Sequence, residues 1–142
     1  MSIESFRPSN VPDFYLRSIP SPQTVLNMIP FSYNIPVAAF AAAGNRQQSV
    51  NLFADSDFLC ISTQSNDGST TATVILSDSS NNWPLMNRAT PIFSIFGNGT
   101  LPYYLPIPWF LIAKTNITAD VTVTGVFAAF VLTFTGLRIY RR

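Results

Sequence analysis

Short segments in which apolar and polar residues alternate follow one another along most of the chain. Residues 49–53 alternate as far as Leu52, and the runs at 57–63 and 71–76 are β-branched or apolar and bounded by turn residues, as β-strands are. Between positions 25 and 140, about eight such segments recur at intervals of roughly 8–12 residues, without a helical period. The pattern predicts an all-β fold, a single jelly-roll-like antiparallel β-sandwich over residues 25–142.

The dipeptide Asp67-Gly68 predicts a tight turn between two of these strands. Asp-Gly is a strong hairpin signal because both central residues of a type I′ turn need positive φ. The register that this turn sets pairs Ile61 with Val74 and Leu59 with Leu76. The resulting hairpin has one apolar face, made of Leu59, Ile61, Ala72, Val74 and Leu76.

Two amphipathic strands near the C-terminus predict a second hairpin. Residues two apart on a strand share a face, so the apolar faces consist of Ala119, Val121 and Val123 on one strand and Phe130, Leu132 and Phe134 on the other. A four-residue connection, 125–128, would place Phe127 outermost at an apolar tip. Such a tip suggests insertion into a partner, and the alternative is that Phe127 folds back onto its own core.

Residues 1–24 are predicted to form an extended N-terminal arm. Prolines at positions 8, 12, 20 and 22 interrupt every regular element, because each one removes a backbone donor and restricts the residue before it. The arm nevertheless carries the apolar side chains of Phe6, Phe14 and Tyr15. Such groups are a liability on a free tail, so we infer that the arm packs against its own domain or a neighbouring subunit.

The charge content of the chain argues against several kinds of function. Its 142 residues include 8 basic and 7 acidic side chains, for a net charge of +1, whereas nucleic-acid-binding domains normally show clustered Lys and Arg. Because the sequence has no histidine, it offers no imidazole base and no His-ligated zinc. We therefore expect a protein without enzymatic activity, cofactor, metal or nucleic-acid partner.

One uncharged segment, residues 121–137, has nearly the length of a membrane span. It is followed by Arg138, Arg141 and Arg142, as a cytoplasmic flank would be. Its threonines recur at steps of two, however, and Gly125 interrupts it, which is typical of paired strands. We interpret the segment as strands and expect no membrane partner, and the polar start of the chain predicts no export signal.

Two features that resemble reactive sites are better explained structurally. Asp55 and Asp57 would share a face of an extended segment and could hold a cation or act as an acid and base pair. No third carboxylate lies nearby, so we interpret them as residues at the start of a strand that hydrogen-bond to nearby backbone. Cys60 lies among apolar neighbours and is interpreted as a buried small hydrophobe.

The segment 101–110 is rich in large aromatic residues and prolines. Its prolines hold the chain extended, and Tyr103, Tyr104 and Trp109 offer the rigid surfaces found at interfaces and sugar-stacking platforms. As an exposed loop, the segment would bind a protein, or a glycan as the last of three interpretations. Alternatively, these rings cover one end of the sandwich.

Four short phrases of the sequence are distinctive: DSDF at 55–58, GNGTLP at 97–102, LPIP at 105–108 and TFTGLRIY at 133–140. Together they resemble small jelly-roll virion proteins of tailed bacteriophages, which include the cement or decoration proteins that sit on a capsid shell. The resemblance covers residues 45–140 and consists of turn and strand style, without a catalytic signature.

The resemblance implies a non-enzymatic capsid cement protein that bridges major capsid protein subunits and stabilises the head. It also implies a homo-oligomer on the capsid surface of the virion, assembled in the host cytoplasm, where contacts repeated by symmetry add up. The contacts are expected from the arm, the proline-aromatic segment and the apolar tip: Phe6, Phe14, Tyr15, Tyr103, Tyr104, Trp109 and Phe127. The alternatives are a neck, tail or fibre-base component, or a carbohydrate-binding β-sandwich module.

Overall fold

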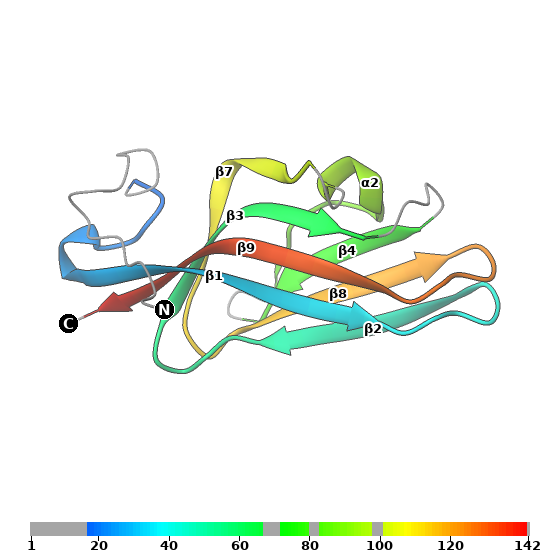
Figure 1. Ribbon diagram of the computed structural model, residues 1–142, viewed down its shortest axis with the longest axis horizontal. Coiled ribbons are helices and arrows are strands. Elements are labelled where there is room, and N and C mark those ends of the chain that lie inside the picture. The colour runs from blue at the N-terminus through cyan, green and yellow to red at the C-terminus, as the bar shows by residue number, and fades with distance from the viewer. Residues whose placement is uncertain (1–16, 67–71, 80–82, 98–100, 142) are drawn as a thin grey trace.

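Two antiparallel sheets lie face to face in the computed structural model, which describes residues 17–66, 72–79, 83–97 and 101–141 (Figure 1). The first sheet has the strand order β1 (Val25–Val37), β9 (Phe130–Arg141), β3 (Asp57–Ser65) and β7 (Tyr103–Leu111). The second has the order β2 (Gly44–Asn51), β8 (Asn116–Val123), β4 (Thr73–Asp78) and β5 (Trp83–Pro84), and β6 (Thr90–Pro91) also pairs with β4. The described residues also form the 3-10 turn η2 (Pro22–Thr24) and the single-turn helix α2 (Ile92–Ile95).

Long strands that follow one another in the chain lie in opposite sheets. β1, β3, β7 and β9 belong to the first sheet, and β2, β4 and β8 belong to the second. The first and last strands pair along their length, from Val37 opposite Phe130 to Val25 opposite Arg141. A double sheet wound in this way is a jelly roll. The predicted all-β jelly-roll sandwich is therefore confirmed.

The predicted hairpin between residues 57–63 and 71–76 is wrong. Both strands exist, as β3 and β4, but they lie in opposite sheets. Leu59 pairs with Phe110 and Leu137, and Leu76 pairs with Ala119. A turn signal marks where the chain reverses but not which sheet receives the next strand. The Asp67-Gly68 pair itself lies outside the described residues.

The predicted hairpin at the C-terminus is wrong for the same reason. The two amphipathic strands are present as β8 and β9, yet β8 pairs with β2 and β4 while β9 pairs with β1 and β3. Their apolar faces meet across the sandwich instead of side by side. Side-chain alternation shows which face of a strand is buried, and it does not identify the neighbouring strand.

Phe127 is not the outermost residue of the connection between β8 and β9. Its backbone N–H and C=O both bond to Phe40, at 2.9 and 2.8 Å, and its ring stacks edge to face on Phe130. The side chain is 9% exposed, whereas that of Val126 is 80% exposed. The alternative in which Phe127 folds back onto its own core is therefore the one that the structure shows.

Large apolar side chains fill the space between the sheets and form what we call the main core. The fully buried residues there include Phe58, Ile117, Leu132 and Phe134. The Phe134 ring contacts the rings of Phe96 and Trp109 edge to face, with centroids 5.6 and 6.3 Å apart. Such contacts between large rings add to the free energy that burial contributes.

A second, smaller cluster of buried side chains, which we call the outer cluster, lies on the other face of the first sheet. Leu59 points away from its neighbours Phe58 and Cys60, as alternation along β3 requires. It packs with further apolar residues of the first sheet and with the end of the arm: Ile19, Val25, Met28, Leu137 and Ile139. The apolar face predicted for the first hairpin is thus divided, because Ala72, Val74 and Leu76 belong to the main core.

The described end of the arm packs against its own domain. Ile19 is buried in the outer cluster, and Arg141 holds the backbone of Pro20 and Ser21 through its guanidinium. The arm residues singled out from the sequence, Phe6, Phe14 and Tyr15, lie outside the described residues.

The uncharged segment 121–137 is not one continuous element. β8 ends at Val123 and β9 begins at Phe130, so the interpretation of this segment as strands is confirmed. In the part of the chain that the structure describes, no helix is both long enough and apolar enough to cross a membrane.

Candidate binding groove along β7

The proline-aromatic segment forms an edge strand instead of the expected loop. Among the described residues, β7 pairs with β3 alone, and its free side is one border of the first sheet. Between Trp109 opposite Cys60 and Tyr104 opposite Ser62, the four residues 105–108 face the single residue Ile61. Pro106 and Pro108 lie in this bulge, where a residue without a backbone N–H is tolerated.

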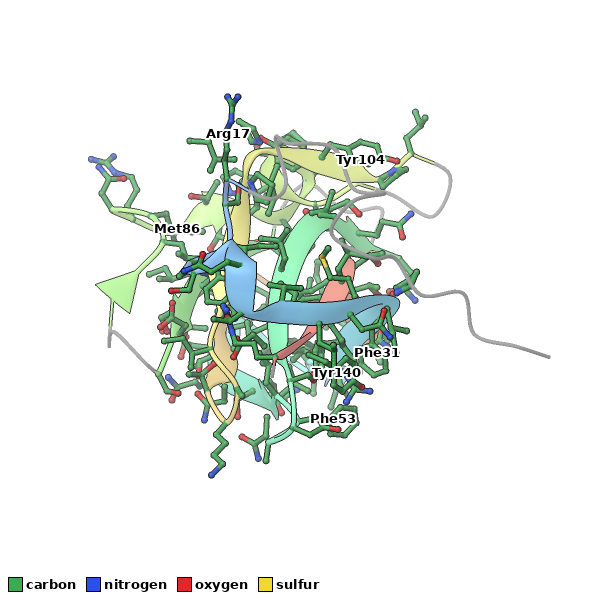
Figure 2. All side chains as sticks on the ribbon, turned by 90° about the vertical axis from the view of Figure 1, so that its left-hand side faces the viewer. Arg17, Phe31, Phe53, Met86, Tyr104 and Tyr140 are labelled. Atoms are coloured by element: carbon green, nitrogen blue, oxygen red, sulfur yellow. The ribbon has the colours of Figure 1, made fainter. Side chains whose placement is uncertain are left out.

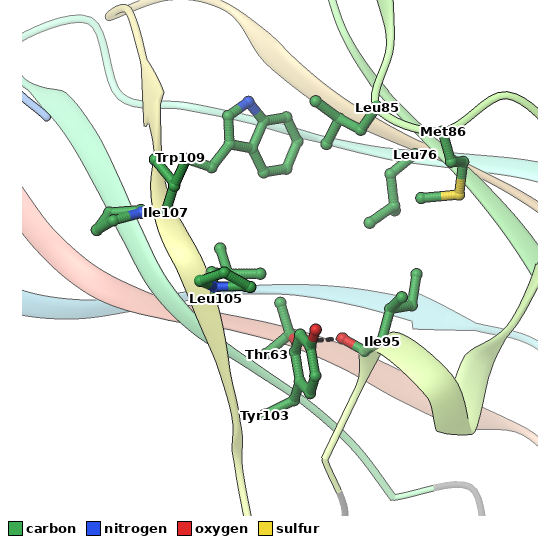
Figure 3. Close-up of a pocket in the computed structure, with 11 residues that line it drawn as sticks. Thr63, Leu76, Leu85, Met86, Ile95, Tyr103, Leu105, Ile107 and Trp109 are labelled. Atoms are coloured by element: carbon green, nitrogen blue, oxygen red, sulfur yellow. Dashed lines mark hydrogen bonds between the residues drawn. The ribbon is translucent and has the colours of Figure 1, made fainter.

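An apolar groove, which we call the β7 groove, opens between β7 and the neighbouring part of the second sheet (Figure 3). Its volume is about 340 Å³, near the lower end of the range for binding pockets. Eleven residues line it, none of them charged: Thr63, Leu76, Leu85, Met86, Ile95, Tyr103, Leu105, Pro106, Ile107, Pro108 and Trp109. The lining includes Leu76 of the main core, so the groove reaches from the surface to the space between the two sheets.

The helix α2 closes one end of the groove and is tied to both sheets. The N–H of Ile92 donates to the carbonyl of Ala72, just before β4, and the N–H of Gly97 donates to the carbonyl of Thr63 on β3, each at 3.0 Å. A Cβ at Gly97 would lie 2.0 Å from the carbonyl oxygen of Leu101, so a glycine is required at this close approach. These bonds hold Ile95 against the groove.

The lining offers few polar groups to a ligand. The side-chain hydroxyls are those of Thr63 and Tyr103, and the Thr63 hydroxyl donates to the carbonyl of Ile95 (Figure 3). Binding sites that orient polar ligands normally place several donors and acceptors around them. The lining therefore suits an apolar side chain better than a sugar.

The three aromatic residues predicted for this segment do not share one surface. Tyr103 and Trp109 line the groove, with Trp109 half-buried against Phe134. Tyr104 points to the other face of β7, where it is 65% exposed (Figure 2). The opposite wall, which includes Leu85, Met86 and Ile95, was not predicted from the sequence. These residues come from short elements without a period, so only the tertiary arrangement reveals them.

Asp55 and Asp57 form ion pairs with arginines of β9, and Asp57 begins β3 as expected. The expected bonds to local backbone are not what holds them, because Asp55 contacts side chains and Asp57 accepts a backbone N–H from a distant segment. Asp55 Oδ1 lies 2.8 Å from Nη2 of Arg138, and Asp57 Oδ2 lies 2.7 Å from Nε of Arg141. Asp57 Oδ1 accepts the N–H of Ala113 at 2.8 Å. Among the described residues, no cluster of three or more His, Cys, Asp or Glu side chains is placed to hold a metal ion.

Arg138 lies within a cluster of aromatic side chains, none of which lines the groove. Its guanidinium carbon lies 4.5 Å from the ring centroid of Phe53, 4.9 Å from that of Phe31 and 5.2 Å from that of Tyr140 (Figure 2). Nearby, burial raises the pKa of the Tyr33 hydroxyl, which accepts the N–H of Phe53. The rings thus surround a cation of their own chain.

Cys60 is a buried thiol of the main core, as interpreted from the sequence. Its sulfur lies 3.6 Å from the carbonyl of Ser62, and burial raises the pKa of the thiol to about 12. The thiolate form that would react is therefore suppressed at neutral pH.

Comparison with known proteins finds no matching family model, no matching curated protein and no matching solved structure. What the chain binds must therefore be inferred from its own surface.

Proposed function

We propose that this chain is a non-enzymatic virion structural protein, a capsid cement or decoration protein that binds neighbouring subunits of the major capsid protein and stabilises the shell. The observation that carries the proposal is the apolar edge of the sandwich. Ile107 is 75% exposed where it lines the uncharged groove, and Tyr104 is 65% exposed on the other face of the same strand, β7. Exposed apolar patches of this kind mark protein interaction sites.

The edge suits contact through side chains better than strand addition. Partners that extend a sheet bond to the free N–H and C=O groups of an edge strand. Pro106 and Pro108 remove two of these donors from β7, and prolines on an edge discourage such pairing. A partner is therefore expected to insert apolar side chains around Tyr104 and Ile107.

The jelly roll and the low charge are consistent with a role on a repetitive shell. A surface with few charges binds through shape and apolar contact, and many weak contacts repeated by symmetry give strong attachment. The resemblance to phage virion proteins adds support, although jelly rolls also serve other functions. A neck, tail or fibre-base location would use the same edge, and copy number separates these locations.

The first test is quantitative mass spectrometry of virus particles purified from the source of this sequence. A cement protein is expected in hundreds of copies, in a small-integer ratio to the major shell protein. About a dozen copies or fewer would move the chain to the neck, tail or fibre base. Its absence from the particles would overturn the proposal.

The second test asks whether the β7 edge makes the contact. Tyr104→Ala combined with Ile107→Ser should leave the fold intact, because both side chains are exposed, and should weaken co-sedimentation with particles lacking the chain at least tenfold. Leu26→Ser is the matched control, since Leu26 is 57% exposed on β1 at the opposite border of the first sheet. Equal binding by both variants would exclude this edge as the contact.

A further inference from the structure

We propose that β2 is a dimerisation edge, at which it pairs antiparallel with β2 of a second copy of this chain. The pairing would join the second sheets of the two copies into one continuous sheet. The inference does not depend on the proposed virion function, because it concerns only contacts between copies of this protein.

β2 is a long edge strand without the features that usually protect an edge. It forms one border of the second sheet and, among the described strands, pairs with β8 alone (Figure 1). Its eight residues pair without a register shift, include no proline, and are all exposed or half-buried. The other borders differ, because β1 contains Pro30 and Pro36, β7 contains Pro106 and Pro108, and β5 has only two residues. Since proteins protect their edges with prolines, bulges or short strands, the unprotected β2 indicates a strand-pairing partner.

Alternate residues of β2 direct their backbone groups away from β8. The N–H of Leu52, directly after β2, donates to the carbonyl of Thr115 at 2.9 Å, and hydrogen-bonded pairs alternate along an antiparallel ladder. Even-numbered residues of β2 therefore face β8, and odd-numbered residues face outward. The outward residues, whose backbone groups bond to no other described segment, are Asn45, Gln47, Ser49 and Asn51. Each offers one N–H and one C=O to a partner.

One register with a second copy uses this whole row of backbone groups. When the two-fold axis passes through Gln48, Gln47 lies opposite the partner's Ser49, and Asn45 lies opposite the partner's Asn51. Every outward residue then belongs to a hydrogen-bonded pair. A shift by two residues in either direction would place Asn45 or Asn51 opposite a residue beyond the end of the strand.

The side chains of β2 are compatible with this symmetric register. Arg46 is the one charged residue of the strand, and it is bound by its own chain. Its Nη1 donates to the carbonyl of Ala38 at 2.6 Å, and its guanidinium carbon lies 4.3 Å from the ring centroid of Phe40. In the symmetric pair, Arg46 lies opposite the partner's Val50, so like charges do not face each other. A strand of the same sequence therefore satisfies the backbone of this edge without electrostatic repulsion.

A single-cysteine experiment on the full-length chain tests the contact and its register. In the symmetric pair, Gln48 lies opposite its own copy at a non-hydrogen-bonded position, where Cα atoms are about 4.5 Å apart and a disulfide can form. Gln48→Cys should therefore give a covalent homodimer under mild oxidation. Gln47→Cys is the matched control, because its two copies would lie about 7 Å or more apart and should crosslink at least tenfold less. Cys60 is buried and does not compete.

Sedimentation of the native protein and of two variants measures the contact without crosslinking. The native chain should sediment as a dimer at micromolar concentration, and Gln47→Pro should be monomeric. The N–H that this proline removes faces outward, so the variant loses a bond to the partner and none to β8. Gln47→Thr keeps the N–H and should remain dimeric. A monomeric native protein, or a Gln47→Pro variant that is folded and still dimeric, would overturn the proposal.

A charge-swap pair distinguishes a second copy from any other occupant of the edge and does not rely on proline. One chain carries Gln47→Lys and Ser49→Lys, and the other carries Gln47→Glu and Ser49→Glu. Because positions 47 and 49 face each other in the symmetric pair, each chain alone should be monomeric at low salt, and the mixture should form a heterodimer. Failure of the mixture to associate would overturn the second-copy assignment, while leaving the particle-composition test of the proposed function untouched.

Discussion

Arg141 and Asp57 form a half-buried ion pair, with Nε of the arginine 2.7 Å from Oδ2 of the aspartate. The two other guanidinium nitrogens bind the arm, through the carbonyls of Pro20 and Ser21 and the hydroxyl of Thr24. One arginine on the last strand therefore joins the start of β3 to the base of the arm. The arginine thus holds Pro20, Ser21 and Thr24 beside the end of β9.

We predict that Asp57→Asn loosens the base of the arm. The amide oxygen can still accept the N–H of Ala113, so the change mainly removes the charged partner of Arg141. A hydrogen bond to a charged group contributes about 2 kcal/mol, and we expect a loss of that order in urea unfolding. Amide hydrogen exchange at residues 19–24 should become faster by a larger factor than exchange in β8. Equal acceleration in both would contradict a role of the Asp57–Arg141 pair in holding the base of the arm.

Gly136 is predicted to tolerate no side chain. A Cβ at this position would lie 1.8 Å from the carbonyl oxygen of Leu59 on the neighbouring strand. Because backbone blocks the space, Gly136→Ala should cost more than about 3 kcal/mol or prevent folding. Gly125→Ala is the control, since nothing lies within 4 Å of its added Cβ, and its free energy of unfolding should stay within about 0.5 kcal/mol of the native value.

Cys60 should be unreactive in the folded protein and should make stability fall at high pH. Burial raises the pKa of its thiol from 9.0 to about 12, so above pH 9 the unfolded chain loses a proton that the folded chain keeps. Stability contributed by the protonated thiol is therefore complete below pH 9 and is lost as the pH rises toward 12, by about 1.4 kcal/mol per unit. Cys60→Ala should lack this component when unfolding is measured between pH 9 and 11.

The connection between β8 and β9 should respond differently at two adjacent positions. Phe127→Asp places a carboxylate where the side chain is nearly buried and is expected to destabilise the fold by about 3 kcal/mol or more. Val126→Asp changes a side chain that is 80% exposed and should leave the thermal midpoint nearly unchanged. Similar midpoints for both variants would show that Phe127 is not part of the core.

The sequence predicted the strands well and their neighbours poorly. The alternation in residues 119–124 and 130–135 correctly identified the inward faces of β8 and β9, because burial imposes a period of two on any strand. It could not show that Val121 pairs with Val74 and Arg46 rather than with Leu132. Strand neighbours in a jelly roll are set by contacts between distant segments, which leave no local pattern.

Only one wall of the candidate site, the wall formed by β7, was predicted from the sequence. Tyr103 and Trp109 stood out because large rings between prolines are unusual in a short segment, and the structure places both in the groove. The opposite wall was missed because Leu85 and Met86 follow a two-residue strand, too short to show a period. The position of Phe127 was left open between an outward tip and the core, because the spacing of a turn gives no information on which way a ring points.

The central position of β9 has a consequence for synthesis of the chain. β9 lies between β1 and β3, so the first sheet lacks an inner strand until residues 130–141 have left the ribosome. Contacts between such distant segments form slowly, and until then the inner borders of β1 and β3 have no partner. The first sheet is thus expected to form only after β9 has been synthesised, and a chain ending near residue 129 should be insoluble even though it contains eight of the nine strands that the structure describes.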